Sequence, residues 1–115
     1  NVERYKANSA TAEFHDMKSL VMFRQGLVKG PIGVYFYDGD HSYEATRDNI
    51  LAAVPLLAPT SVLLVDDWRG PIIQAGTRDA IAQAGLRIEW ERSLGDTTKG
   101  RDFWNGLGVF VLAKP

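Results

Sequence analysis

The stretch IGVYFYDGDH, residues 32–41, decides the fold because an apolar run of strand length ends abruptly in acidic residues. Its first six residues are almost all apolar, aromatic or β-branched, which is typical of a parallel strand covered on both faces. A second run, SVLLVDD at residues 61–67, repeats the pattern. The two runs predict buried strands that each end in acid.

Helix signals follow both runs. Ser42 is suited to cap a helix, Glu44 lies in its first turn, and apolar residues recur behind them at helical spacing. We therefore expect a helix over residues 42–57. Pro71 fits the first turn of a second helix, expected over residues 71–84.

Shorter elements are expected toward the two ends of the chain. Residues 12–15 suit a short strand, and Asp16 is suited to cap a helix that Gly30 would stop. Residues 86–91 alternate strictly between apolar and polar, as in a strand near the sheet edge with one exposed face. This alternation places Trp90 inward.

The order strand, helix, strand, helix, strand, strand, with the last strand at residues 107–113, predicts one α/β domain over residues 1–115. Two successive strand-helix-strand units imply a right-handed parallel sheet with helices on both faces, and the closing pair of strands forms an antiparallel hairpin. Ligands bind beyond the carboxyl ends of such strands. The two acidic clusters should therefore meet in space.

Composition narrows the function classes. A net charge of −1 gives no electrostatic reason to expect nucleic acid or an anionic membrane surface. No apolar run reaches the roughly 18 residues that span a bilayer. The absence of cysteine excludes disulfides and thiolate metal sites. We expect a cytoplasmic protein whose partner is a small molecule or a protein.

The acidic constellation is the predicted functional site. Asp38, Asp40, Asp66 and Asp67 would converge on one crevice, and like charges that close repel each other. A divalent cation with a preference for oxygen, such as Mg2+, would relieve the repulsion. His41 is better suited to act as a base or a substrate contact.

Each of these residues also has a structural interpretation. Asp38 can be a strand-end turn residue, Asp40 an Asx turn or a helix cap, and His41 a surface side chain. One of Asp66 and Asp67 can cap the helix that follows. Two independent strands that both end in acid favour a shared functional site over these separate explanations.

Parts of the chain resemble two classes of phosphotransfer protein, but each match lacks a required feature. YFYDGDHS at residues 35–42 resembles the Asp-x-Asp motif of the haloacid dehalogenase class, but no lysine lies between Asp38 and Asp67. VLLVDD at residues 62–67 resembles the start of a phosphorelay receiver, but too few strands follow it before Pro115.

A third resemblance follows the order of features along most of the chain. YDGDHSY at residues 37–43 resembles the fourth-strand motif of small-molecule O-methyltransferases related to macrocin and catechol methylating enzymes. These belong to the class I, Rossmann-like methyltransferases that use S-adenosylmethionine. LLAP at residues 56–59 and VLLVDDW at residues 62–68 resemble the loop and the fifth strand of that family, with its paired metal-binding acids.

This resemblance implies a role for each acidic residue. Asp38, Asp66 and Asp67 would bind Mg2+ or another divalent cation, which would hold a small-molecule hydroxyl near the methyl donor and lower its pKa. Asp40 or His41 would accept the hydroxyl proton.

Two further residues receive roles from the same resemblance. Asp16 falls in the region where the family contacts the adenine of S-adenosylmethionine. Trp68 lies at the expected crevice rim, where it would stack on a substrate, with packing as the alternative.

The chain also departs from the family pattern. The Gly-rich loop of the first strand and the acidic end of the second strand, which bind the methyl donor, are not found. The sheet is therefore expected to be incomplete, without the family's first two strands. We expect either the carboxyl-terminal part of a methyltransferase or a truncated, inactive relative that binds a partner or forms a homodimer through its exposed sheet edge.

Overall fold

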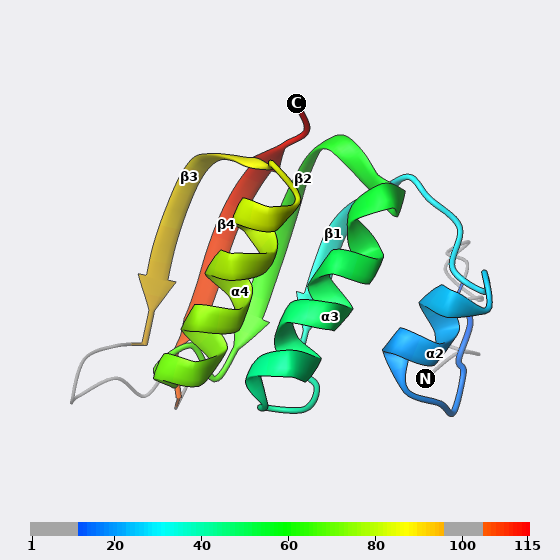
Figure 1. The fold of residues 1–115 in the computed structure, drawn as a ribbon, viewed down its shortest axis with the longest axis horizontal. Helices are drawn as coiled ribbons and strands as arrows, with labels where there is room; N and C mark the ends of the chain where they lie inside the picture. The colour runs from blue at the N-terminus through cyan, green and yellow to red at the C-terminus, as the bar shows by residue number, and fades with distance from the viewer. Residues whose placement is uncertain (1–11, 96–104) are drawn as a thin grey trace.

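The computed structural model describes residues 12–95 and 105–115. They form a sheet with helices packed against it (Figure 1). The elements in chain order are α2 (Ser19–Arg24), β1 (Ile32–Tyr37), α3 (Tyr43–Ala53), the 3-10 turn η1 (Val54–Leu56), β2 (Leu57–Asp66), α4 (Pro71–Gln83), β3 (Arg87–Leu94) and β4 (Leu107–Ala113).

The four strands have the spatial order β1-β2-β4-β3. β1 and β2 are parallel, and β4 is antiparallel to both of its neighbours. β3 therefore runs in the same direction as β1 and β2. The predicted α/β class, with a parallel sheet and a closing antiparallel hairpin, is confirmed. The hairpin folds back so that β4 lies inside the sheet and β3 at its edge.

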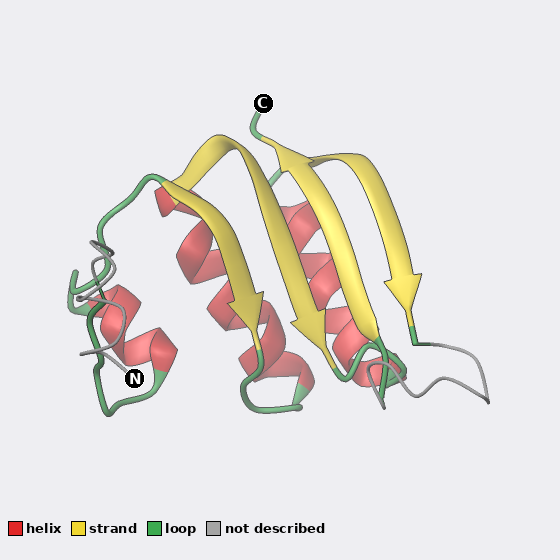
Figure 2. Ribbon diagram, turned by 180° about the vertical axis from the view of Figure 1, so that it is seen from behind, coloured by secondary structure: helices red, strands yellow, loops and turns green. Residues whose placement is uncertain are grey.

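The expected cover of both sheet faces is wrong for the described residues, because α3 and α4 lie on the same face (Figures 1 and 2). The reason is topological. The connections from β1 to β2 and from β2 to β3 step across the sheet in the same direction. Two right-handed crossovers in one direction must place their helices on one face.

The opposite face therefore keeps apolar side chains in contact with solvent. Val34 and Phe36 on β1 are 61% and 50% exposed. The predicted inward position of Trp90 is also wrong, since this side chain is 50% exposed. A register shift separates Ile88 from Trp90, and Trp90 pairs with Val111 on the face without helices.

The core fills the space between the sheet and helices α3 and α4. Its fully buried side chains come from β2, β4, α3 and α4 and include Leu63, Phe110, Leu112, Ile50 and Thr77. Gly76 lets α4 approach α3 closely, because a Cβ there would lie 2.9 Å from the carbonyl oxygen of Tyr43.

Helix α3 begins as predicted. The Ser42 hydroxyl accepts a hydrogen bond from the Ala45 amide at 3.1 Å, as an N-cap does. The helix ends at Ala53, earlier than expected, because Pro55 continues the chain as a 3-10 turn. α4 begins at Pro71 as predicted.

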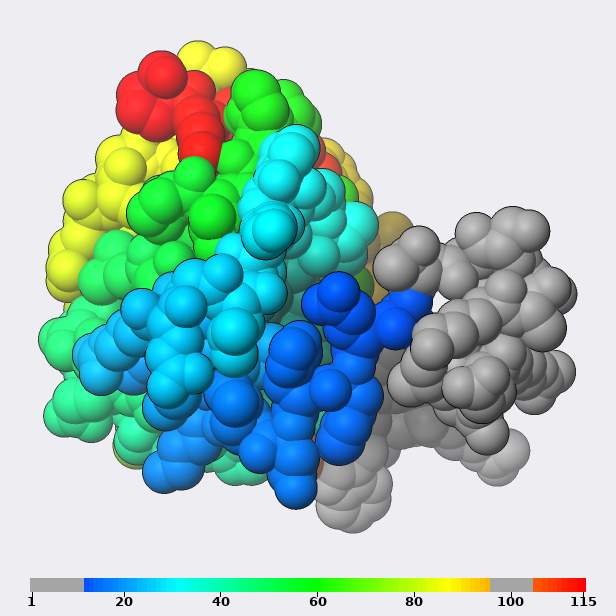
Figure 3. Space-filling view, turned by 90° about the vertical axis from the view of Figure 1, so that its right-hand side faces the viewer, coloured from blue at the N-terminus to red at the C-terminus, as the bar shows by residue number. Residues whose placement is uncertain are grey.

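The amino-terminal part differs more from the predictions. Residues 12–15 form no strand, and the cap position of α2 is Lys18 instead of Asp16. Gly26, with a φ of 69°, follows this short helix, so the chain turns before Gly30. α2 lies beyond β1 at one flank of the molecule (Figures 1 and 3). None of the described helices has the length and apolar character required to cross a bilayer.

Candidate functional site

The carboxyl ends of β1 and β2 lie side by side, as the parallel pairing requires. Tyr37 pairs with Val65, so Asp38 and Asp66 follow on neighbouring strands. The two acidic segments therefore meet at one edge of the sheet, as the sequence predicts. Asp67 comes next, in the left-handed region with a φ of 56°.

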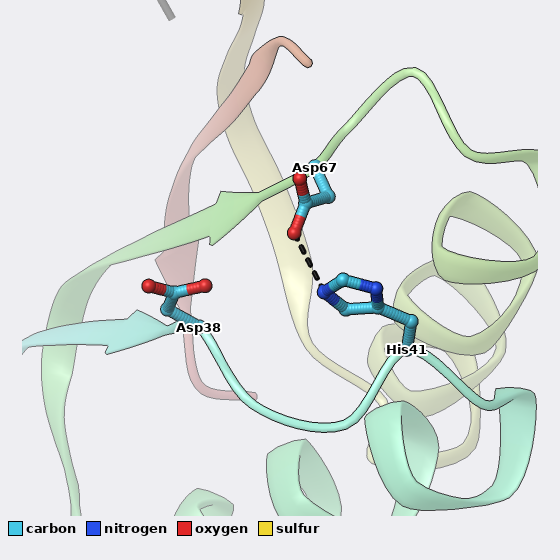
Figure 4. A group of neighbouring side chains, drawn as sticks. All are labelled: Asp38, His41 and Asp67. Carbon is cyan, nitrogen blue, oxygen red and sulfur yellow. Dashed lines mark ion pairs between the residues drawn. The ribbon is translucent and has the colours of Figure 1, made fainter. Parts of the chain in front are cut away.

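Three side chains at this edge converge. Asp38, His41 and Asp67 each place a ligand atom within 4.8 Å of the others. The His41 Nε2 atom lies 2.7 Å from the Asp67 Oδ2 atom, and Figure 4 shows the imidazole turned toward that carboxylate. The His41 side chain is 64% exposed, whereas that of Asp67 is 19% exposed. We call Asp38, His41 and Asp67 the converged cluster.

The negative charges of Asp66 and Asp67 lie close to Asp38. Partial desolvation raises the pKa of Asp38 above its ordinary value, and the hydrogen bond and negative charge of Asp66, with the charge of Asp67, raise it further. His41 acts in the opposite direction. Negative charge at this edge therefore stabilises the protonated form of Asp38, and a bound cation would relieve the same repulsion.

Asp66 contacts the cluster without belonging to it. Its side chain raises the pKa of Asp38, but the three ligand atoms that converge come from Asp38, His41 and Asp67. The three acids to which the sequence assigned a cation thus lie near one another, with the His41 imidazole beside Asp67.

Asp40 has a different position from its neighbours. Its Oδ1 atom accepts a hydrogen bond from the Ser42 amide at 2.8 Å, which is an Asx turn at the start of α3. This hydrogen bond lowers the pKa of Asp40 below its ordinary value. The structural interpretation accounts for these contacts, and a carboxylate with a lowered pKa is a weaker proton acceptor.

Trp68 lies in the core beneath the cluster. It is 5% exposed, packs edge-on against Phe110 at 5.2 Å between ring centroids, and donates from Nε1 to the Ser93 hydroxyl at 3.0 Å. Gly108 leaves room for this indole, because a Cβ there would lie 2.6 Å from the ring. The packing alternative accounts for the contacts of Trp68.

Asn105 is a site residue that the sequence interpretation missed. Its Nδ2 atom donates to the Asp67 Oδ1 atom at 3.0 Å, across 38 positions of sequence. The available signal was the Asn105-Gly106 dipeptide, which is typical of a turn before a strand. That signal predicts a turn, but it does not predict that the Asn105 side chain bonds to Asp67.

Two hollows flank the converged cluster. One, of about 430 Å³, is lined by His41, Asp67, residues 69–73 and Asn105. The other, of about 390 Å³, is lined by residues 17–19 and 35–39 and therefore includes Asp38. Asp16 is exposed and is not part of the converged cluster. Along the chain it directly precedes residues 17–19, which line the second hollow. The edge thus offers a separate space on each side of the acidic residues.

Comparison with known proteins gives one family and several similar folds. A family model described as a methyltransferase domain matches residues 1–68. No curated protein matches the chain. TrmN from Thermus thermophilus has a similar structure, with a TM-score of 0.61 and 17% identity over 98% of this chain. The M1.HpyAVI-SAM complex is similar with a TM-score of 0.53 and 10% identity over 89% of this chain. The chain covers 32% and 53% of these two proteins.

Proposed function

We propose that this chain, which belongs to the methyltransferase domain family, is the part of an S-adenosylmethionine-dependent methyltransferase that binds the acceptor and contacts the methyl donor. The reaction proposed is cation-assisted O-methylation of a small-molecule hydroxyl. One observation carries the proposal: ligand atoms of Asp38, His41 and Asp67 lie within 4.8 Å of one another at the carboxyl ends of neighbouring parallel strands. This is where α/β sheets of this kind bind their ligands.

The donor set fits a divalent cation. Carboxylate oxygens suit hard divalent cations such as Mg2+ and Mn2+. Asp38 and Asp67 would hold the cation, which would also offset the negative charge that Asp66 adds beside Asp38. A bound cation supplies Lewis-acid chemistry that lowers the pKa of a hydroxyl.

His41 is the residue we propose as proton acceptor. Its Nε2 atom faces the Asp67 carboxylate, which accepts hydrogen bonds only. In the neutral imidazole the proton therefore lies on Nε2, and Nδ1 is the nitrogen that can accept another. Asp40 is less suited because its carboxylate is bonded to the Ser42 amide. His41 Nδ1 would take the proton that the hydroxyl loses. The methyl donor would supply the methyl group, by cleavage of its C–S bond, and leave as a neutral thioether.

We assign the acceptor to one of the two hollows and the methyl donor to the other. The hollow beside His41 and Asp67 includes the apolar side chains of Pro71, Ile72 and Ile73, which suit the body of an organic acceptor. The hollow beside Asp38 follows directly on Asp16 along the chain, and we propose it for the methyl donor.

The experiment is isothermal titration of the full chain with Mg2+ and with S-adenosylmethionine. The proposal expects heat from both ligands, and loss of the Mg2+ heat in an Asp38→Asn, Asp67→Asn double variant. Heat from neither ligand would contradict the enzymatic function for this chain.

A binding or dimerising module is the second candidate function. The observation that favours it is β1, which within the described residues has a strand neighbour on one side only and exposes Val34 and Phe36. An open apolar strand edge is suited to pair with another chain. Mass measurement in solution, with the chain at several concentrations, tests for the homodimer.

A further inference from the structure

We propose that Asn105 is a positioning residue, which holds the Asp67 carboxylate in the orientation that faces His41. The inference rests on the proposed function, since it concerns the same site. Asn105 lies beyond residue 68, where the match to the family model ends. It therefore adds to the site a residue from a part of the chain that the family match does not include.

The carboxylate of Asp67 is held from two sides. Its Oδ1 atom accepts from Asn105 Nδ2 at 3.0 Å, and its Oδ2 atom lies 2.7 Å from His41 Nε2. An ionised carboxylate can only accept, so both neighbours donate. Because each oxygen has its own donor, rotation of the carboxylate would break both contacts.

The backbone fixes Asn105 in place. β2 and β4 pair as far as Asp66 and Leu107. Beyond that pair the Trp68 amide donates to the Gly106 carbonyl at 3.2 Å, and the Arg69 amide donates to the Asn105 carbonyl at 2.9 Å. The contact between the two segments thus continues past the strands and brings the Asn105 side chain opposite Asp67.

The backbone of Asp67 forms a tight turn directly after β2. Its φ of 56° is uncommon for a residue other than glycine, and the Gly70 amide closes the turn by donating to the Asp67 carbonyl at 3.0 Å. The His41 side chain on the other side is 64% exposed, and Asn105 is also exposed. What distinguishes Asn105 is its backbone, whose carbonyl accepts from the Arg69 amide at 2.9 Å.

The orientation of the Asp67 carboxylate also affects the tautomer of His41. While Asp67 accepts from Nε2, His41 keeps the tautomer that leaves Nδ1 as the acceptor nitrogen. If Asn105 loses its amide, the carboxylate turns more freely, and both its ligand geometry and the His41 tautomer become less defined. Residues that support metal ligands in this way typically change metal affinity by about 10–100-fold when they are removed.

The test compares Asn105→Leu and Asn105→Ala with a matched control, Gln74→Met. The Gln74 side chain also holds this loop, by donating to the Trp68 carbonyl at 2.6 Å, but its bond goes to the backbone. Two measurements are made on the full chain: Mn2+ affinity by titration, and the ring-nitrogen NMR shifts of His41 without metal, at a pH where these shifts show the wild-type imidazole to be neutral.

We expect both Asn105 variants to lose about 10–100-fold in Mn2+ affinity and to show a mixture of His41 tautomers, whereas Gln74→Met keeps the wild-type values. Wild-type behaviour of both Asn105 variants, or an equal loss in Gln74→Met, would overturn the inference. If the wild-type chain binds no Mn2+, the cation part of the proposed function fails. The His41 shifts of the metal-free variants then decide the role of Asn105 alone.

Discussion

The sheet has two apolar faces, and they have different surroundings. On the helix face, Leu63, Phe110 and Leu112 are 1–2% exposed. On the other face, Val34 and Phe36 remain 61% and 50% exposed. Both faces carry apolar side chains whose removal from water would stabilise the fold. The difference shows that the described residues form a core on one side of the sheet only. The open face is suited to bind a further layer of protein.

The largest expected effect tests this difference directly. Phe110→Ala should lower the free energy of unfolding by about 3–5 kcal/mol, because it empties a fully buried aromatic site. Phe36→Ala on the open face should change it by only about 0.5 kcal/mol. Urea denaturation measures both. Equal losses would mean that the open face is covered in solution.

A second prediction concerns what covers the open face if the chain dimerises. Phe36→Asp should weaken such a homodimer by about 2 kcal/mol or more, since it places a charge at the centre of an apolar contact. Light scattering over a range of protein concentrations measures the dimer. Glu89→Asp, an exposed change that keeps the charge on edge strand β3, is the control. A dimer that is unaffected by Phe36→Asp would place the interface elsewhere.

Removal of the N-cap of α3 should also lower the free energy of unfolding. Ser42→Ala removes the hydroxyl that accepts from the Ala45 amide and should cost about 1 kcal/mol. Ser42→Thr retains an accepting hydroxyl and serves as the control. Thermal unfolding followed by circular dichroism measures both variants. Identical stabilities of the two variants would mean that the cap contributes nothing.

The smallest expected effect is a pH dependence from Asp40. The Ser42 amide lowers the pKa of this carboxyl below its ordinary value of 3.8 in the folded chain. Its stabilising effect is therefore present above 3.8 and is lost as the pH falls through the lower folded value. Compared with Asp40→Ala, the wild-type chain should lose its stability advantage only in that acidic range. An advantage that persists below it would contradict the assignment.

Local signals predicted the elements of the helix face well. The apolar runs of β1 and β2, the Ser42 cap and Pro71 at the start of α4 each depend on residues close in sequence, and all four are found. The meeting of the acidic segments also followed, because parallel strands bring their carboxyl ends to one edge.

Several errors concern contacts between distant parts of the chain, beyond the local ones near residues 12–18. The inward position predicted for Trp90 ignored a register shift in β3, which no periodicity reveals. The placement of β4 between β2 and β3 and the contact of Asn105 with Asp67 depend on how the closing hairpin returns to the sheet. A single sequence contains no local signal for that return.

The most direct test of the central claim is a Mg2+ titration of the full chain followed by amide chemical shifts. Binding at the converged cluster predicts saturable changes concentrated at residues 38–41 and 66–68, and their loss in the Asp38→Asn, Asp67→Asn double variant. Changes on the open face, or none at these residues at saturating Mg2+, would contradict a cation site at the ends of β1 and β2.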